Sequence, residues 1–227
     1  MQSWADRLGV FDVETTGVNV DAVRIVSAHV GVLDADGRLA VRHDWLVDPG
    51  VEIPPQAQAV HGISTERAKR EGMPAASAVG QIVETLARLF EDGVAVTAYN
   101  APYDFTVLDR EAARYGIAGL DGPRPVIDPL VIDRQVDKYR RGKRTLQVTC
   151  EHYGVALDNA HDASSDAAAA GRLAQELARR FPQLVVPATQ LHDDQVAWSR
   201  AQAEDFEAYM RRVKDPSFRA AVGWPVR

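Results

Sequence analysis

Apolar and polar positions alternate in a way that predicts strands first and helices later. Three strands are expected in the N-terminal part, at residues 8–13, 24–33 and 38–47. The first is an apolar run that stops at the turn-forming Thr15-Thr16-Gly17, which is typical of a buried strand. Asp34-Ala35-Asp36-Gly37 is a favourable hairpin turn between the other two. A proline-rich stretch at residues 48–55 then ends this pattern.

The following residues alternate helical periodicity with short apolar runs. Residues 74–90 place Val79, Ile82 and Leu86 on one helical face, and Gly93 ends the helix. Short strands are expected at residues 94–98 and 126–127, and helices at residues 101–114, 130–139, 145–153 and 164–181. An early hairpin followed by alternating helices and strands predicts an α/β fold with a mixed five-stranded sheet and flanking helices.

The C-terminal part differs from the rest. Apolar or small residues recur at spacings of three and four across residues 193–214, which predicts one amphipathic helix. We therefore expect a domain at residues 1–181 and a C-terminal helical extension at residues 182–227. Such a helix can dock on its own domain, and a partner-binding helix is the alternative.

Composition and charge narrow the class of protein. The chain has 227 residues, of which 46% are hydrophobic, enough for one α/β domain with an appendage. A single cysteine, Cys150, excludes a disulfide framework within the chain. There is no membrane-spanning apolar run and no signal-peptide pattern, so we expect a cytoplasmic protein without a membrane partner. The net charge of −6 argues against coating nucleic acid by bulk electrostatics but is compatible with an acidic catalytic centre.

Acidic residues at one strand end supply the first candidate chemistry. Asp12 and Glu14 alternate with Phe11 and Val13, so both carboxylates point to one face of the strand. Two carboxylates on an apolar strand are unfavourable without a compensating cation, and hard divalent metals take such oxygen ligands. Taken alone, the pair also fits a solvated strand terminus.

Two later segments carry further polar residues at helix starts. Asn100 and Asp104 follow the strand at residues 94–98 and open a helix, where either could simply cap or charge the first turn. His161 precedes a helix that begins near Asp162 or Ser164, and Asp166 lies in an early turn of that helix. Each of these segments has an ordinary structural explanation, and their combination is what points to catalysis.

These residue types, in this order and at these spacings, resemble the DEDDh exonuclease family. That family includes the proofreading epsilon subunit of bacterial DNA polymerase III, oligoribonuclease and ribonuclease T. The resemblance covers residues 8–181 and implies a ribonuclease-H-like fold. Two departures are Tyr99, where His commonly precedes the Asn, and Tyr103, where Phe is usual.

The resemblance implies a two-metal hydrolysis. Asp12, Glu14, Asp104 and Asp166 match the carboxylates that hold two divalent ions, Mg²⁺ with Mn²⁺ as a substitute. Two such ions roughly 3.5–4 Å apart stabilise the attacking and leaving oxygens of a phosphodiester. His161 would accept the proton of the attacking water, because an imidazole with an ordinary pKa near ~6.5 suits neutral pH.

Substrate contacts are expected at two places. Thr15 and Thr16 match the family's turn near the 3′ end, and His61 lies in a segment that helps to hold the terminal nucleotide, with Asn100 as a further candidate. Residues 134–144 contain six basic side chains and one acidic one. The four candidates for contacts with backbone phosphates are Arg140, Arg141, Lys143 and Arg144. The alternative for this segment is a solvated basic loop.

The expected function is a 3′→5′ exonuclease that acts on 3′ ends of DNA in proofreading or repair. Single-stranded DNA is the expected form of the substrate. An exoribonuclease or oligoribonuclease is the alternative, because sugar discrimination depends on pocket shape around the 2′-position. A non-catalytic subunit of a polymerase or repair complex is the alternative of another class. The sequence leaves the oligomeric state open.

Overall fold

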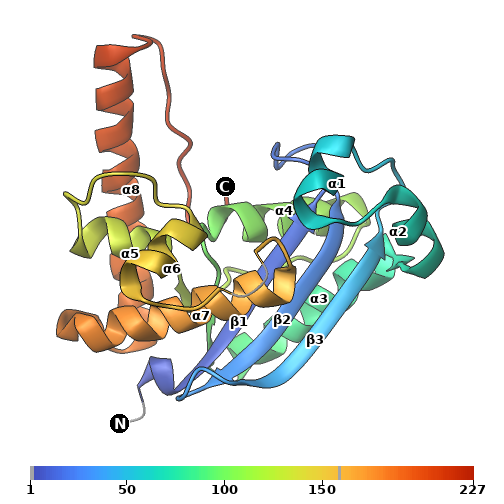
Figure 1. Cartoon of the computed structure of the whole chain (residues 1–227), viewed down its shortest axis with the longest axis horizontal. Coiled ribbons are helices and arrows are strands. Elements are labelled where there is room, and N and C mark those ends of the chain that lie inside the picture. Colours follow the sequence, from blue (N-terminus) through green and yellow to red (C-terminus); the bar gives the residue numbers. More distant parts are fainter. Residues whose placement is uncertain (1–2, 158–159) are drawn as a thin grey trace.

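A mixed sheet forms the centre of the computed structural model, which describes residues 3–157 and 160–227 (Figure 1). The strand order is β4-β3-β2-β1-β5-β6. The strands are β1 (Arg7–Thr15), β2 (Ile25–Asp34), β3 (Leu39–Asp48), β4 (Met73–Pro74), β5 (Ala95–Thr97) and β6 (Val126–Ile127). Strands β1 to β3 are antiparallel neighbours, whereas β4, β5 and β6 run parallel to β3, β1 and β5.

The α/β fold with an antiparallel N-terminal hairpin is confirmed, and the strand count is corrected from five to six. The additional strand, β4, has two residues and pairs Met73 with Val47 and Pro74 with Asp48. A two-residue strand that contains proline leaves no alternating pattern in the sequence, so periodicity could not indicate it.

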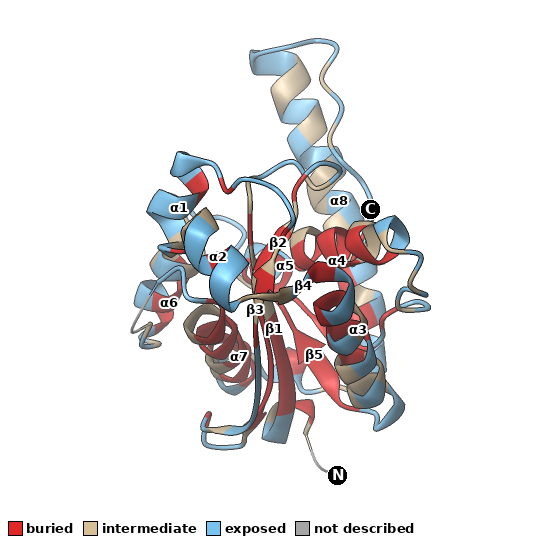
Figure 2. Ribbon diagram, turned by 90° about the vertical axis from the view of Figure 1, so that its right-hand side faces the viewer, coloured by how far each residue is buried: buried red, intermediate tan, exposed pale blue. Residues whose placement is uncertain are grey.

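Helices cover both faces of the sheet. The helices are α1 (Pro55–His61), α2 (Thr65–Glu71), α3 (Ala75–Glu91), α4 (Pro102–Arg114), α5 (Pro129–Val136), α6 (Leu146–Tyr153), α7 (Ala163–Arg180) and α8 (Ala188–Val213), with 3₁₀ turns η1 (Trp4–Asp6) and η2 (Pro182–Leu184). Figure 2 shows α7 on one side of the sheet and α3 and α4 on the other. No described helix has the length and apolarity that a membrane crossing would need.

The alternation of side chains along β1 decides which face receives the acids. Phe11 and Val13 pack into the cluster that includes α3 and α4. Val10 packs on the other face, against Ala167 and Ala168 of α7. Asp12 and Glu14 have the same parity as Val10, so they lie on the α7 face of the sheet.

Small residues let α7 approach that face closely. Asp162 caps the helix by accepting a hydrogen bond from the Ser165 backbone N–H, as its residue type predicts. Further along, a Cβ atom on Gly171 would lie 2.5 Å from Val10 Cγ1 and 2.6 Å from Leu33 Cδ1. The absence of a side chain at Gly171 therefore lets α7, which carries Asp166, pack closely against β1 and β2.

Two helical features differ from the expectations. Helices α1 and α2 were not predicted, because each has seven residues and follows a proline-rich stretch without a repeated apolar face. Helix α8 begins at Ala188 rather than residue 193, and its first turns bury Leu191, His192 and Gln195. Two of those three buried residues are polar, so an apolar periodicity could not mark this start.

Candidate active site

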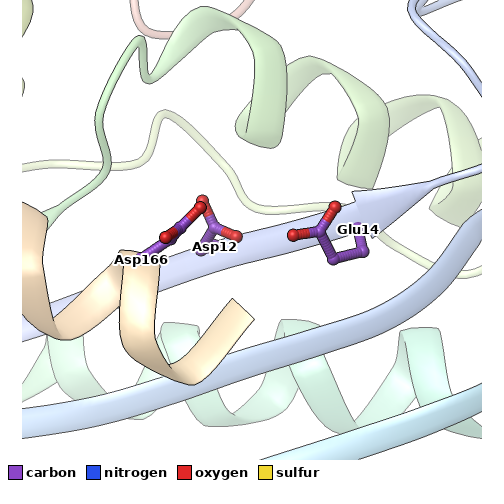
Figure 3. A group of neighbouring side chains, drawn as sticks. All are labelled: Asp12, Glu14 and Asp166. Atoms are coloured by element: carbon purple, nitrogen blue, oxygen red, sulfur yellow. The ribbon is translucent and has the colours of Figure 1, made fainter. Parts of the chain in front are cut away.

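Three carboxylates from two elements meet beside the sheet. Asp12 and Glu14 come from β1, and Asp166 comes from the first turn of α7. One oxygen of each can be chosen so that all three lie within 4.8 Å of one another. Figure 3 shows the three side chains gathered between the strand and the start of the helix. The sequence-predicted acids of the first and last motifs are thus brought together.

Asp104 approaches this group from α4, the helix on the other side of the sheet from α7. It belongs to the first turn of α4 and is almost completely buried. Its Oδ1 accepts a hydrogen bond from the Val13 backbone N–H at 3.1 Å, between Asp12 and Glu14. Asp104 is outside the close trio, but it is near enough that its charge disfavours ionisation of Asp12.

Burial and mutual repulsion perturb all four acids. Burial first, then the neighbouring charges of Asp104, Glu14 and Asp166, raise the pKa of Asp12 well above its usual value. Burial and the charge of Asp166 raise the pKa of Glu14 to about 8. Burial likewise raises the pKa of Asp104 and that of Asp166. A cation bound among these carboxylates would offset their mutual repulsion and favour their ionised forms.

The donor set fits a hard divalent metal. All four candidate ligands are carboxylates, which Mg²⁺ and Mn²⁺ accept. Asp166 Oδ1 is buried and has no hydrogen-bond partner among the described residues. A buried carboxylate oxygen without a partner is unfavourable, and a metal–oxygen bond would satisfy it.

His161 lies at the edge of the acidic group, on the loop before α7. Its backbone has a left-handed φ of 67°, and its backbone N–H donates to Asp166 Oδ2 at 3.2 Å. The residue is exposed, and its ring is close enough to Asp166 to favour ionisation of that carboxylate. Asp162, the helix cap, is a further acid near the site: its charge disfavours ionisation of Asp12 and Glu14.

The turn after β1 is held by a cluster of hydroxyl groups. Thr15 Oγ1 lies 2.7 Å from the Gly17 carbonyl and 2.5 Å from the Tyr103 hydroxyl, which itself lies 2.6 Å from that carbonyl. Thr16 Oγ1 accepts from the Arg24 backbone N–H at 3.0 Å. Sequence reasoning noted Tyr103 only as a departure from the usual Phe, and its hydroxyl proves to anchor this turn.

His61 is the last residue of α1, and Asn100 lies in the turn that leads into α4. The His61 ring is next to the Thr15 backbone, and burial lowers the pKa of its imidazole. Asn100 is exposed and has a left-handed φ of 64°. Its backbone N–H donates to the Asp128 carboxylate at 3.0 Å. Both residues remain candidates for substrate contacts.

The basic loop between α5 and α6 requires a correction. Arg140 and Arg144 both form ion pairs with Asp133, which is completely buried, and their own side chains are only 9% and 12% exposed. The Tyr153 hydroxyl donates to the same carboxylate at 2.9 Å. These two arginines therefore hold the loop in place, and the expectation that they face phosphates is withdrawn.

Comparison with known proteins gives the family. Residues 10–174 match the RNase_T family, described as exonuclease. The PolC-type DNA polymerase III of Streptococcus thermophilus is 29% identical over 168 residues, covering 72% of this chain and 10% of the relative. The corresponding protein of Streptococcus suis is 30% identical over 169 residues with the same coverage. The chain thus spans about a tenth of the length of these curated relatives.

Solved structures share the fold at lower identity. E. coli Exonuclease I with a dA16 oligonucleotide aligns with a TM-score of 0.66 and 19% identity, over 88% of this chain and 44% of that one. Exonuclease X with 5′-overhanging duplex DNA gives 0.58 and 18%, over 82% and 99%. The nuclease domain of 3′hExo, a DEDDh family member bound to rAMP, gives 0.65 and 16%, over 80% and 96%. Because the family match extends over most of the chain and includes all five candidate catalytic residues, this protein belongs to the RNase_T exonuclease family.

Proposed function

We propose that the chain is a metal-dependent 3′→5′ exonuclease that hydrolyses phosphodiester bonds at 3′ ends of DNA. The observation that carries the proposal is the meeting of Asp12, Glu14 and Asp166 in a member of an exonuclease family. The raised pKa values of Asp12 and Glu14, and the Asp166 oxygen that has no hydrogen-bond partner within the described part of the chain, are what carboxylates suited to binding a cation would show.

Asp12, Glu14, Asp104 and Asp166 would hold two divalent ions, Mg²⁺ or, as a substitute, Mn²⁺. Bound divalent ions supply Lewis-acid stabilisation of the charge that develops on phosphate oxygens during an in-line displacement. Asp12 would be one of the carboxylate ligands of these ions. The hydrogen bond from the Val13 N–H to Oδ1 fixes the orientation of the Asp104 carboxylate.

His161 is the proposed general base. A ring nitrogen of its imidazole would accept a proton from the attacking water, and the exposed ring could then release that proton to solvent. The hydrogen bond from its backbone to Asp166 keeps the residue beside the acids.

The 3′-terminal nucleotide would lie against the turn at Thr15 and Thr16, with His61 and Asn100 on either side. The entering strand would pass the loop between α5 and α6, where Arg141 and Lys143 are exposed. Asp133 holds this loop through Arg140 and Arg144, so the two exposed cations are presented on an ordered support.

We propose DNA as the substrate because the compared relatives are DNA polymerases and two of the compared exonucleases were solved with bound DNA. RNA is the second candidate, since a neighbour of similar fold was solved with rAMP. A polymerase or repair complex remains a proposed partner, and the exposed Phe206, Tyr209 and Val213 of α8 are compatible with one. A purely non-catalytic subunit would have no need for four converging carboxylates.

A degradation time course tests the proposal. Single-stranded DNA, duplex DNA and RNA, each labelled at the 5′ end, are incubated with Mg²⁺, Mn²⁺ or chelator. We expect a ladder of shortening labelled DNA products with metal and no products with chelator, and Asp12→Ala should abolish the ladder. Immediate release of the label as a mononucleotide would contradict the 3′→5′ direction, and faster loss of RNA would favour the second candidate.

A further inference from the structure

The open edge of β6 is closed by side chains of α8. His192 Nδ1 accepts a hydrogen bond from the Val126 backbone N–H at 3.0 Å. Gln195 Nε2 donates to the Val126 carbonyl at 3.1 Å, and Gln195 Oε1 accepts from the Asp128 N–H at 2.7 Å. Both side chains are buried. The amide of Gln195 thus replaces the backbone of a further strand, and this fixes α8 to the end of the sheet.

Asp128, directly after β6, is the centre of a second set of hydrogen bonds. Its carboxylate is 1% exposed. It accepts from the backbone N–H groups of Asn100, Ala101 and Leu130, each at 3.0 Å. A fourth donor, the Trp224 indole Nε1, lies 3.3 Å away and comes from the C-terminal segment. The Trp224 ring also packs on His192, with ring centroids 4.9 Å apart.

Two of the three backbone N–H groups that Asp128 accepts from, those of Asn100 and Ala101, belong to the turn that leads into α4. Asn100 has its left-handed φ there, a conformation that asparagine tolerates better than most residues, and Asp128 holds it by accepting from the Asn100 N–H. Asp104 follows in the first turn of the helix and reaches the Val13 N–H. The end of the chain contacts the same helix again: Arg227 N–H donates to Thr106 Oγ1 at 3.0 Å, and Arg110 Nη2 donates to the Arg227 carbonyl at 2.9 Å.

We propose that residues 188–227 position a catalytic acid: Gln195 and Trp224 fix Asp128, Asp128 enforces the turn at Asn100, and this turn places Asp104. In this scheme Asp128 and Trp224 are positioning residues that do not touch the substrate. The inference rests on the proposed function, because it takes Asp104 to be a metal ligand. It makes residues 188–227 necessary for the geometry of the exonuclease site.

Two matched tryptophan substitutions test this. Trp224→Phe removes the indole N–H and keeps an aromatic ring on His192. Trp4→Phe is the control, because Trp4 is also buried and its Nε1 donates to the Leu184 carbonyl at 3.0 Å, without any bond to Asp128. Amide hydrogen exchange of residues 98–104 and Mn²⁺ binding by calorimetry are measured on both full-length variants.

We expect Trp224→Phe to speed exchange at Asn100 and Ala101 and to weaken Mn²⁺ binding by about tenfold, the effect of losing one hydrogen bond to a charged group. The control should leave both quantities unchanged even where its thermal stability falls. Equal effects of the two substitutions, or none from Trp224→Phe, would overturn the proposal. Faster exchange with unchanged Mn²⁺ affinity would also overturn it, since Asp104 would then be placed independently of the turn.

Asp128→Asn is the second variant. Its single amide oxygen can accept from the Asn100 and Leu130 N–H groups, which share Oδ1 of Asp128. Its NH₂ group then faces the Ala101 N–H and the Trp224 indole, which lose their acceptor. Exchange at residues 98–104 should therefore accelerate more than in Trp224→Phe, and an unchanged rate would contradict the scheme. These exchange measurements need no substrate, so their outcome does not depend on hydrolysis. If the wild-type chain hydrolysed no nucleic acid, the proposed function would be rejected, while the exchange results would still test the positioning of the turn.

Discussion

Asp104 accepts a hydrogen bond from the backbone N–H of Val13, and this contact joins α4 to β1 between two acids of the candidate site. Asp104→Asn keeps an acceptor for Val13 but removes the charge, so we expect a folded protein that has lost nearly all activity. Asp104→Leu also leaves the buried Val13 N–H without a partner, which costs about 1–3 kcal/mol. Urea unfolding and exonuclease rates of the two variants check this, and equal stabilities would argue against the contact.

His161 should be needed for turnover and not for metal binding. His161→Asn is the suitable substitution, because asparagine tolerates the left-handed φ of 67°. We expect turnover to fall by about 10²–10⁴-fold, the usual contribution of a general base. Mn²⁺ affinity should stay within a few-fold of wild type. His43→Asn, at an exposed position on β3, is the control. A wild-type rate for the His161 variant across neutral pH would remove the imidazole from the mechanism.

The stability of the metal-free protein should decrease as pH rises. The folded-state pKa of Glu14 is about 8, whereas an unperturbed glutamate has about 4.3. Between these values the folded state binds more protons than the unfolded state, so the free energy of unfolding falls with pH. Urea unfolding in chelator between about pH 5 and pH 8 measures the slope. Glu14→Gln should flatten it, and saturating Mg²⁺ should do the same for the wild type; a rising slope in chelator would contradict the prediction.

Arg141 and Lys143 should affect substrate binding, and Arg140 should affect folding. Neutralising both exposed cations with Gln should lower the salt slope of single-strand binding by about 1.4, since each phosphate contact contributes about 0.7. Thermal stability should not change. Arg140→Gln instead leaves the buried Asp133 with one partner fewer and should lower stability. An unchanged salt slope in the double variant would reject the phosphate role.

Gly171→Ala should destabilise the chain although alanine favours helices. The added methyl group would meet Val10 and Leu33 at separations well below ordinary contact. We expect a loss of about 1–3 kcal/mol, typical of overpacking in a core. Ala201→Gly, at an exposed position of α8, is the comparison for helix propensity alone. A gain in stability at position 171 would show that α7 can move away from the sheet.

The early strands and the long helices could be predicted from the sequence because their patterns are local. The hairpin turn at residues 34–37, the cap at Asp162 and the apolar face of α3 are each read within a few residues. Strand parity predicted that Asp12 and Glu14 share one face of the strand. That Asp166 joins them was expected only from the resemblance of these motifs to an exonuclease family.

Roles that depend on distant partners could not be predicted. Asp133 is an ordinary acid in the sequence, and only packing reveals that it neutralises Arg140 and Arg144. His192 and Gln195 lack an apolar pattern, and their role follows from the edge of β6, some 65 to 70 residues earlier. Periodicity in a sequence marks apolar side chains that are buried on one face of an element. These contacts are made by polar side chains, so periodicity does not indicate them.

The way α8 closes β6 also bears on self-association. A chain shortened to end at Phe181 would lose His192 and Gln195 and would expose the Val126 N–H and C=O groups on an apolar strand. Unpaired strand edges of this kind recruit other chains, so the shortened protein should form aggregates or edge-to-edge dimers. Helix α8 therefore covers a strand edge that would otherwise be open to pairing.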